Sequence, residues 1–462
     1  MTKKIFLGLM TYFLLFAAFS ALPLEVGAQP KRDIQRAKKL ATEGDKFFQQ
    51  KNYQSAIDKY AEAIVLVPKN GSVHFWKGYA HYYLNQYDQA IGDLDAALTQ
   101  GYKPLEIYKV RWFINYQNKK YDAALSDVQQ ALKLDRGFYF INALGDVYRG
   151  KGDWQNALVA YRTAAQVEPN NADVNYSIAF ASYNLGDTKT QETAAQEAVK
   201  RNTQFMGESF FLIGDALYKA KRTDEAMKTF ERVVNMKPAI AEVYAPLSDI
   251  YRSQGRFNDA ITLTKKGLEL YPDDGNLYIS LSWYYSLADK HKEAVEAGEK
   301  AISFAPEQSM GFTNLCRAYN DIRKYEDAIK TCNQALKLNP NDGETNFYLG
   351  RAYNFLKNTD TAAQYYKKAV VGLEEFTRNN PDYSDGFYLL GNAYFSDGQR
   401  EKAIEAYKKS LELSPNFAKV RYNLGYLYFL KNDTAAAREQ YEALKKIDYV
   451  TAEKLKQAME KK

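Results

Sequence analysis

Nearly the whole sequence repeats itself with a period of about 34 residues. Glycines in one shared sequence context set the register: Gly44, Gly78, Gly145, Gly214, Gly350, Gly391 and Gly425. Each is followed at the same spacing by an alanine: Ala56, Ala90, Ala157, Ala226, Ala362, Ala403 and Ala437. The complete pattern predicts twelve repeats, which start at residues 37, 71, 105, 138, 172, 207, 241, 275, 309, 343, 384 and 418. Because each repeat of such an array packs mainly on its neighbours, a chain of 462 residues does not need one large core.

Each repeat has the pattern of two amphipathic helices joined by a short polar turn. Within each half, apolar or small residues recur at spacings of three and four, which places them on one face of an α-helix. Small residues in both halves let the two helix axes approach, and an aromatic ring fills the space beside them. Prolines, which cannot continue a helix, close many repeats: Pro68, Pro169, Pro238, Pro272, Pro306, Pro340 and Pro415. The pattern predicts an all-α solenoid of about twenty-five helices.

In these features the sequence resembles the tetratricopeptide-repeat (TPR) family. The resemblance covers residues 37–451, and the repeat that contains Gly145, Ala157, Tyr161 and Pro169 matches the family pattern position by position. It implies a right-handed superhelix of twelve helix-turn-helix repeats whose usual role is to bind other proteins or peptides.

In the TPR family, a set of positions on the first helix of each repeat lines the concave face, where peptides dock. At these positions the chain carries many rings, with acidic residues in the middle and basic residues beyond them. The partner-binding residues implied by the resemblance are Phe75, Tyr79, Tyr82, Phe113, Tyr116, Asp146, Tyr176, Phe180, Tyr183, Phe211, Asp215, Tyr218, Asp249, Trp283, Arg317, Phe347, Arg351, Tyr388, Tyr422 and Tyr426. Rings beside polar groups are typical anchors of protein interfaces. The alternative, that many of these rings only pack against the next repeat, stays open.

One repeat and the two ends depart from the regular pattern. The repeat that starts at residue 343 has seven extra residues within 370–382, which would lengthen its second helix by about two turns. This extension either protrudes toward a partner or is a tolerated insertion. Residues 29–36 are expected to extend the first helix, and residues 449–462 to form the polar closing helix that a solenoid needs at its exposed end.

The chain offers few residues for catalysis or metal binding. Of its three histidines, His74 and His81 lie about 10.5 Å apart along one predicted helix, too far to share a metal ion. The sequence has no phosphate-binding glycine loop, no paired-cysteine zinc spacing and no nucleophile motif. A net charge of +6 without a long basic run argues against a nucleic-acid partner. We therefore expect no enzymatic activity, no metal, no cofactor and no nucleic-acid partner.

The two cysteines both lie in the repeat that starts at residue 309. The turn between its helices is centred near Lys324, so Cys316 and Cys332 are expected at the same height on facing helices. In an oxidising compartment such a pair predicts a disulfide that staples the hairpin. Two buried thiols are the alternative.

Residues 1–28 have the pattern of a secretory signal peptide. Two lysines precede an apolar stretch over residues 5–24, and Val26 and Ala28 supply the small residues of a cleavage site before Gln29. An uncleaved membrane anchor is the alternative, because the apolar stretch could just span a bilayer. No later segment is long and apolar enough to do so, so we expect export, with the periplasm or cell envelope as the destination.

Together these features predict a non-catalytic protein-binding scaffold or adaptor of the cell envelope. A module that binds glycan or peptidoglycan is the main alternative, because aromatic grooves also stack on sugar rings. An enzyme subunit with a cryptic site is the third class.

Overall fold

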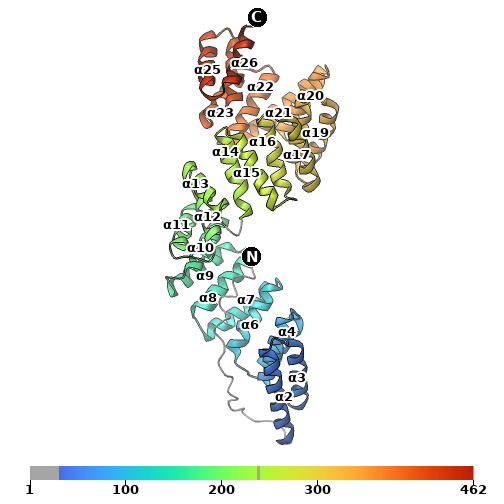
Figure 1. Ribbon diagram of the computed structural model, residues 1–462, viewed down its shortest axis with the longest axis vertical. Coiled ribbons are helices and arrows are strands. Elements are labelled where there is room, and N and C mark those ends of the chain that lie inside the picture. The colour runs from blue at the N-terminus through green and yellow to red at the C-terminus, as the bar shows by residue number, and fades with distance from the viewer. Residues whose placement is uncertain (1–30, 237–239, 461–462) are drawn as a thin grey trace. The chain divides into compact units, whose positions relative to one another are not determined.

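The computed structural model of the protein describes residues 31–236 and 240–460, and Figure 1 shows how their helices follow one another. Across these residues every regular element is a helix, either α or, in the case of η1 (Ala241–Val243), a short 3-10 helix. The predicted all-α solenoid is confirmed. None of the helices in this part of the chain is long and apolar enough to cross a membrane. The predicted signal peptide, residues 1–28, lies outside the described residues.

The chain divides into an N-terminal part, residues 1–169, and a C-terminal part, residues 170–462. The helices of the N-terminal part are α2 (Lys31–Gln49), α3 (Tyr53–Leu66), α4 (Gly71–Tyr83), α5 (Tyr87–Thr99), α6 (Pro104–Gln117), α7 (Tyr121–Leu134), α8 (Phe138–Gly150) and α9 (Trp154–Val167). They pack as successive pairs, and each pair contacts the next one along the chain.

The C-terminal part continues the same succession of pairs. Its helices before the long one are α10 (Ala172–Leu185), α11 (Thr188–Lys200), α12 (Met206–Lys219), α13 (Thr223–Val234), α14 (Tyr244–Ser253), α15 (Phe257–Leu270), α16 (Gly275–Leu287), α17 (His291–Phe304), α18 (Ser309–Asp321), α19 (Tyr325–Leu338) and α20 (Gly343–Phe355). The remaining helices are α21 (Thr359–Asn379), α22 (Ser384–Ser396), α23 (Arg400–Leu413), α24 (Ala418–Leu430), α25 (Thr434–Ile447) and α26 (Tyr449–Glu460). From the second repeat on, the first helix of each pair, or η1 in the repeat of residue 241, begins within one residue of the predicted repeat start.

The ends of the helices are set by local chemistry. Asn and Asp side chains accept hydrogen bonds from backbone N–H groups of the first helical turn, as Asn52 does from Ser55 at 3.2 Å and Asp153 from Asn156 at 3.1 Å. The turn inside a pair places one residue in the left-handed region, such as Gly152 with φ +74°. These short signals recur with the period of the repeat, so the sequence specifies where helices start and stop.

Close packing inside a pair depends on the recurring glycine. A Cβ added at Gly145 would lie 2.5 Å from the ring of Tyr161, and one at Gly391 would lie 2.4 Å from the ring of Tyr407. The absence of a side chain therefore lets a fully buried ring of the second helix lie directly against the backbone of the first. This is the packing predicted from the small residues and the ring of each repeat.

The two cysteines lie on facing helices of one pair. Cys316 of α18 and Cys332 of α19 form a disulfide, with their Cα atoms 5.3 Å apart. Both residues are fully buried, so the bridge joins the two helices inside the core.

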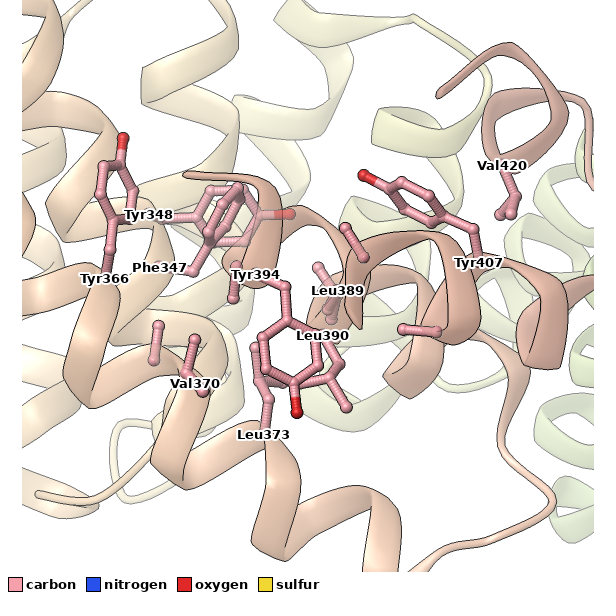
Figure 2. Packing of buried hydrophobic residues seen from close by; sticks show 14 of the residues in the cluster. Phe347, Tyr348, Tyr366, Val370, Leu373, Leu389, Leu390, Tyr394, Tyr407 and Val420 are labelled. Atoms are coloured by element: carbon pink, nitrogen blue, oxygen red, sulfur yellow. The ribbon is translucent and has the colours of Figure 1, made fainter. Parts of the chain in front are cut away.

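One hydrophobic core of the C-terminal part spans the last repeats. Figure 2 shows Phe347 and Tyr348 of α20 and Val370 and Leu373 of α21 in this cluster. Leu389, Leu390 and Tyr394 of α22, Tyr407 of α23 and Val420 of α24 belong to it as well. The long helix α21 thus buries an apolar stripe along most of its length.

Candidate binding pocket in the C-terminal part

The C-terminal part contains a pocket of about 560 Å³. Its wall comes from the first helices of five successive repeats, α14, α16, α18, α20 and α22, together with the end of α21. The lining includes rings, amides and charged groups: Asp249, Trp283, Tyr284, Met310, Asn314, Arg317, Asn341, Asp342, Glu344, Glu375, Phe376, Asn379, Asn380, Tyr383, Asp385 and Leu389. This volume lies in the range of pockets that hold a small molecule or a few residues of a peptide.

Beside the pocket, the solenoid contacts itself across four repeats. Arg252 of α14 donates from its guanidinium to Asp385 of α22. Lys419 of α24 donates to the backbone oxygen of Ser286 at 3.1 Å and to Asp289 at 2.8 Å, which joins the repeats of α16 and α24. Residues more than a hundred positions apart in the sequence therefore hold the two ends of the pocket together.

The extra residues of α21 form one side of the pocket instead of protruding as a separate arm. Gly372 lies against the start of α20, where an added Cβ would be 2.5 Å from the backbone oxygen of Asn341. This close approach aims the last turns of α21 at the lining, where they contribute Glu375, Phe376 and Asn379. The insertion that the sequence left unexplained is part of the pocket wall.

A buried ion-pair network ties α14 to α22. Arg252 and Asp385 are both almost completely buried, and Arg252 also donates to Asp249 at 2.7 Å. The Arg252 guanidinium lies 5.3 Å from the centre of the Tyr383 ring. Asp249 accepts a further hydrogen bond from the hydroxyl of Tyr218 on α12, at 3.0 Å. Charges withdrawn from water in this way depend on one another, so the loss of one partner destabilises the rest.

A second network crosses three repeats. The Arg317 guanidinium of α18 lies 3.6 Å from the centre of the Trp283 ring of α16 and donates to Glu344 of α20 at 2.8 Å. It also donates to Asn314 at 2.9 Å, and the Asn314 amide donates to the backbone oxygen of Ile279 at 2.9 Å. Arg317 is 3% exposed, so its orientation is specified by these contacts and not by solvent.

The environment of Glu344 changes how its carboxyl titrates. Burial raises the pKa of Glu344 to about 7, an increase that Asp342 reinforces and that the Arg317 cation opposes. Burial also raises the pKa of Tyr348 and that of Tyr383, so both hydroxyls stay neutral at physiological pH. The charge of Glu344 therefore changes near neutral pH.

Three of the sequence-predicted binding residues, Asp249, Trp283 and Arg317, are brought together in this pocket. Three others line a smaller pocket of about 270 Å³ nearer the C-terminus: Phe347, Arg351 and Tyr426. There Arg351 donates to Asp321 at 2.9 Å. Two further predicted rings pack on neighbours, Tyr388 with its centroid 5.1 Å from that of Phe417 and Tyr422 at 6.4 Å from Tyr426.

The predicted rings of α10 and α12 form a separate row. Tyr176 is buried and stacks on Phe205 at 4.4 Å, which is the packing role that the sequence left open. Phe180 lies 6.4 Å from Tyr183, and Tyr183 lies 6.2 Å from Phe211. These rings are neighbours of one another but do not line the 560 Å³ pocket.

The predicted rings of the N-terminal part also form a row of their own: Phe75, Tyr79, Tyr82, Phe113 and Tyr116. Ring centroids of Tyr79 and Tyr82 are 6.0 Å apart, and those of Tyr82 and Phe113 are 6.1 Å apart. Trp112 continues the row from Phe113 to Tyr116, at 5.8 and 6.1 Å. Phe75 is 7% exposed and therefore serves mainly as core.

The other predicted acids are engaged within the chain. Asp146 accepts a hydrogen bond from the Tyr161 hydroxyl at 2.8 Å. Asp215 accepts one from the Gln191 amide at 2.8 Å, and Gln191 stands where most repeats have alanine. Each of these carboxylates thus links the first helix that carries it to a neighbouring helix, and its predicted part in partner binding stays a prediction.

Sequence reasoning missed Arg252, Glu344, Phe376 and Asp385. Arg252, Glu344 and Asp385 stand at concave-face positions of their first helices but were not among the residues selected there, whereas Phe376 lies within the extra residues of the longer repeat. The seven extra residues were the available signal, because an insertion that disturbs an otherwise regular period marks a place where the wall of the solenoid differs. Among the described residues, no group of His, Cys, Asp and Glu is placed to hold a metal ion.

Stacked helix pairs with glycine-against-ring packing and a pocket on their first helices define a helical-repeat binding protein. The chain belongs to the tetratricopeptide-repeat family. Models of the TPR repeat match residues 44–84, 145–186 and 391–432, and other tetratricopeptide-repeat models match 183–240, 214–284, 310–342, 331–364 and 418–450.

Curated relatives share parts of the chain at low identity. The small glutamine-rich tetratricopeptide repeat-containing protein 2 of Saccharomyces cerevisiae is 26% identical over 171 residues, which are 37% of this chain and 49% of that protein. The Hsp70-Hsp90 organising protein of Plasmodium falciparum is 26% identical over 34% of this chain and 28% of its own length. Human serine/threonine-protein phosphatase 5 is 31% identical over 23% of each chain. The chain thus spans half or less of the length of these relatives.

Among solved structures, similar chains include one from the APC/C hetero-tetramer Cut9-Hcn1, with a TM-score of 0.38 and 16% identity over 92% of this chain and 96% of that one. Human IFIT1, solved as a dimer with PPP-AAAA, has a TM-score of 0.38 and 18% identity over 74% of this chain and 90% of its own.

Proposed function

We propose that the protein is a non-catalytic scaffold that holds a segment of a partner polypeptide in the 560 Å³ pocket. The observation that carries this proposal is that five successive first helices contribute side chains to the lining of one pocket. Apolar rings, amides and charged groups lie together in this lining, which is the composition of a binding pocket.

The lining suits a peptide. Trp283, Met310 and Phe376 supply apolar contact area, and Met310 and Phe376 are 46% and 39% exposed at the wall. Amide side chains at Asn341 and Asn379 offer hydrogen bonds that a peptide backbone can accept or donate. An apolar body with a few placed polar groups is what pockets for such ligands have in common.

The relatives support a binding role of this general kind. The name of the Plasmodium falciparum relative, the Hsp70-Hsp90 organising protein, describes a protein that organises Hsp70 and Hsp90. A repeat protein that organises other proteins needs surfaces that hold them, and the pocket is such a surface in this chain. The carboxylates of the lining disfavour a nucleic-acid partner, since they repel a phosphate backbone.

We also propose that the protein acts in the cell envelope after export. The signal-peptide pattern of residues 1–28 supports this, and so does the Cys316–Cys332 disulfide, because disulfides persist in oxidising compartments. N-terminal sequencing of the protein isolated from the envelope should find Gln29 as the first residue. A chain that starts at Met1 in the membrane fraction would favour the uncleaved anchor.

Photocrosslinking tests the binding role. A photoreactive amino acid replaces Met310 at the pocket, and a control places it at Phe304, which is 42% exposed on α17 and outside the lining. We expect an envelope protein to crosslink from position 310 only, and the crosslink to be lost when Phe376→Ala is added.

Two results would contradict the proposal. Equal crosslinking from positions 304 and 310 would show that the pocket is not the contact. Retention of the protein on insoluble cell-wall material, with no crosslinked polypeptide, would replace the proposal by the glycan-binding alternative.

A further inference from the structure

Carboxylates dominate the charged lining of the 560 Å³ pocket. The acidic residues of the lining are Asp249, Asp342, Glu344, Glu375 and Asp385. Arg317 is the cation among the lining residues, and it is held by Trp283, Asn314 and Glu344. Arg252, which is not a lining residue, pairs with Asp249 and Asp385, and Arg317 pairs with Glu344, so Asp342 and Glu375 are the lining carboxylates without an ion pair among the described residues.

Asp385, another lining carboxylate, has one oxygen atom without a hydrogen-bond partner in the described part of the chain. Its side chain is almost completely buried at the start of α22, and one carboxylate oxygen accepts from Arg252. The other oxygen, Oδ1, is buried and has no hydrogen-bond partner among the described residues. A buried acceptor without a donor is unfavourable, so this oxygen marks a place for a donor brought by a ligand.

The rings of the pocket suit a cation. The face of Trp283 already carries the Arg317 guanidinium at 3.6 Å, which shows that a stacked cation is accommodated on this wall. Phe376 contributes a second, partly exposed ring from α21, beside the exposed carboxylate of Glu375. An aromatic surface next to carboxylates holds the stem of a long basic side chain while the acids receive its charged end.

On the basis of the proposed function, we propose that the pocket selects a lysine or arginine side chain of the partner polypeptide. The alkyl stem of that side chain lies along Phe376, and its charged end donates toward Asp385 Oδ1 and the neighbouring carboxylates. Neutral and acidic partner segments are discriminated against, because they leave the lining charge uncompensated.

A peptide selection tests the inference. The purified protein is immobilised and used to select from a displayed library of random hexapeptides, and each recovered peptide is tested again on the Phe376→Ala variant. Peptides that need Phe376 report on the pocket. We expect these peptides to share Lys or Arg at one position, and replacement of that residue by norleucine, which keeps the stem and removes the charge, to abolish binding.

Charge variants with a matched control complete the test. Glu375→Gln and Glu344→Gln should each weaken such a peptide by about five-fold, the effect of one partly screened ion pair. Glu374→Gln changes the same charge one residue away on the same helix, but Glu374 accepts from the Tyr394 hydroxyl at 2.5 Å and does not line the pocket. Affinity should be unchanged in this control, and circular dichroism spectra and cooperative melting curves show that all three variants are folded.

The outcomes separate the two proposals. Phe376-dependent peptides without a basic position overturn the inference and leave the peptide-binding function standing. So do peptides that bind the Glu375→Gln and Glu344→Gln variants as tightly as the unaltered protein. The absence of any Phe376-dependent peptide overturns both.

Discussion

The Arg317 guanidinium lies over the Trp283 indole, 3.6 Å from its centre, while donating to Glu344 at 2.8 Å. The three residues come from the first helices of three successive repeats, so this contact links neighbouring repeats through their inner face. Because Arg317 is buried, the same contact also shapes the wall of the pocket. Arg317 therefore serves both the stability of the repeats and the shape of the pocket. Stability measurements and binding measurements test these two roles.

The ion pair between Arg252 and Asp385 should contribute strongly to stability. Asp385→Ala leaves the buried Arg252 cation with Asp249 as its remaining carboxylate, so we expect the free energy of unfolding to fall by about 3 kcal/mol. Urea unfolding, monitored by tryptophan fluorescence, measures this loss of unfolding free energy. The matched control is Asp382→Ala, which removes an exposed ion pair with Lys221 and should cost less than about 1 kcal/mol. Equal effects of the two variants would show that the solenoid is not held closed by the buried pair.

The recurring glycine should tolerate no side chain. In Gly145→Ala the new Cβ would lie 2.5 Å from the Tyr161 ring, so we expect a loss of about 2 kcal/mol and a lower melting temperature. Gly92→Ala on α5 is the control, because no atom lies within 4 Å of the position of its Cβ. That variant should gain about 0.5 kcal/mol from higher helix propensity. A neutral result at position 145 would argue against the close packing of ring and backbone.

Stability should depend on the titration of Glu344. The folded pKa of about 7 is above the ordinary value of 4.5, so between these two pH values the folded protein holds a proton that the unfolded chain has lost. The contribution of Glu344 is therefore most favourable below pH 4.5 and is lost as the pH rises through 7, by about 3 kcal/mol. Glu344→Gln should remove this part of the pH dependence. Urea midpoints at pH 5 and pH 8 give the comparison, and parallel shifts in both proteins would contradict the assignment.

The disulfide should stabilise the hairpin of α18 and α19. The bridge spans a sequence separation of 16, and a loop of that size contributes about 3 kcal/mol in the chain-entropy model. We expect the Cys316→Ala, Cys332→Ala double variant to show faster hydrogen exchange in α18 and α19 than the intact protein. The denatured, unreduced protein should resist alkylation and weigh about 2 Da less than the reduced form. Two freely alkylated thiols would support the alternative reading of the sequence.

Much of the architecture could be predicted because its causes are local. The spacing of Gly145, Ala157 and Tyr161 specifies two helices and the way they pack, since ring and glycine are brought together by one short turn. The same short turn places Cys316 and Cys332 opposite each other along two facing helices. The candidate site was predicted less well. Trp283 and Arg317 are in the pocket, whereas Tyr176 is packed on Phe205.

The amino-acid pattern specified the helices, their pairing and the succession of repeats, because turns, caps and apolar spacings act over fewer than about 35 residues. Which inner faces would meet in space depended on the accumulated rotation from one repeat to the next. That rotation brings Arg252 to Asp385 and places the extra turns of α21 at the pocket. Neither contact can be predicted from the sequence of a single repeat. Small changes in packing at each interface add up over four repeats, so the position of the pocket is a property of the folded solenoid and not of any single repeat.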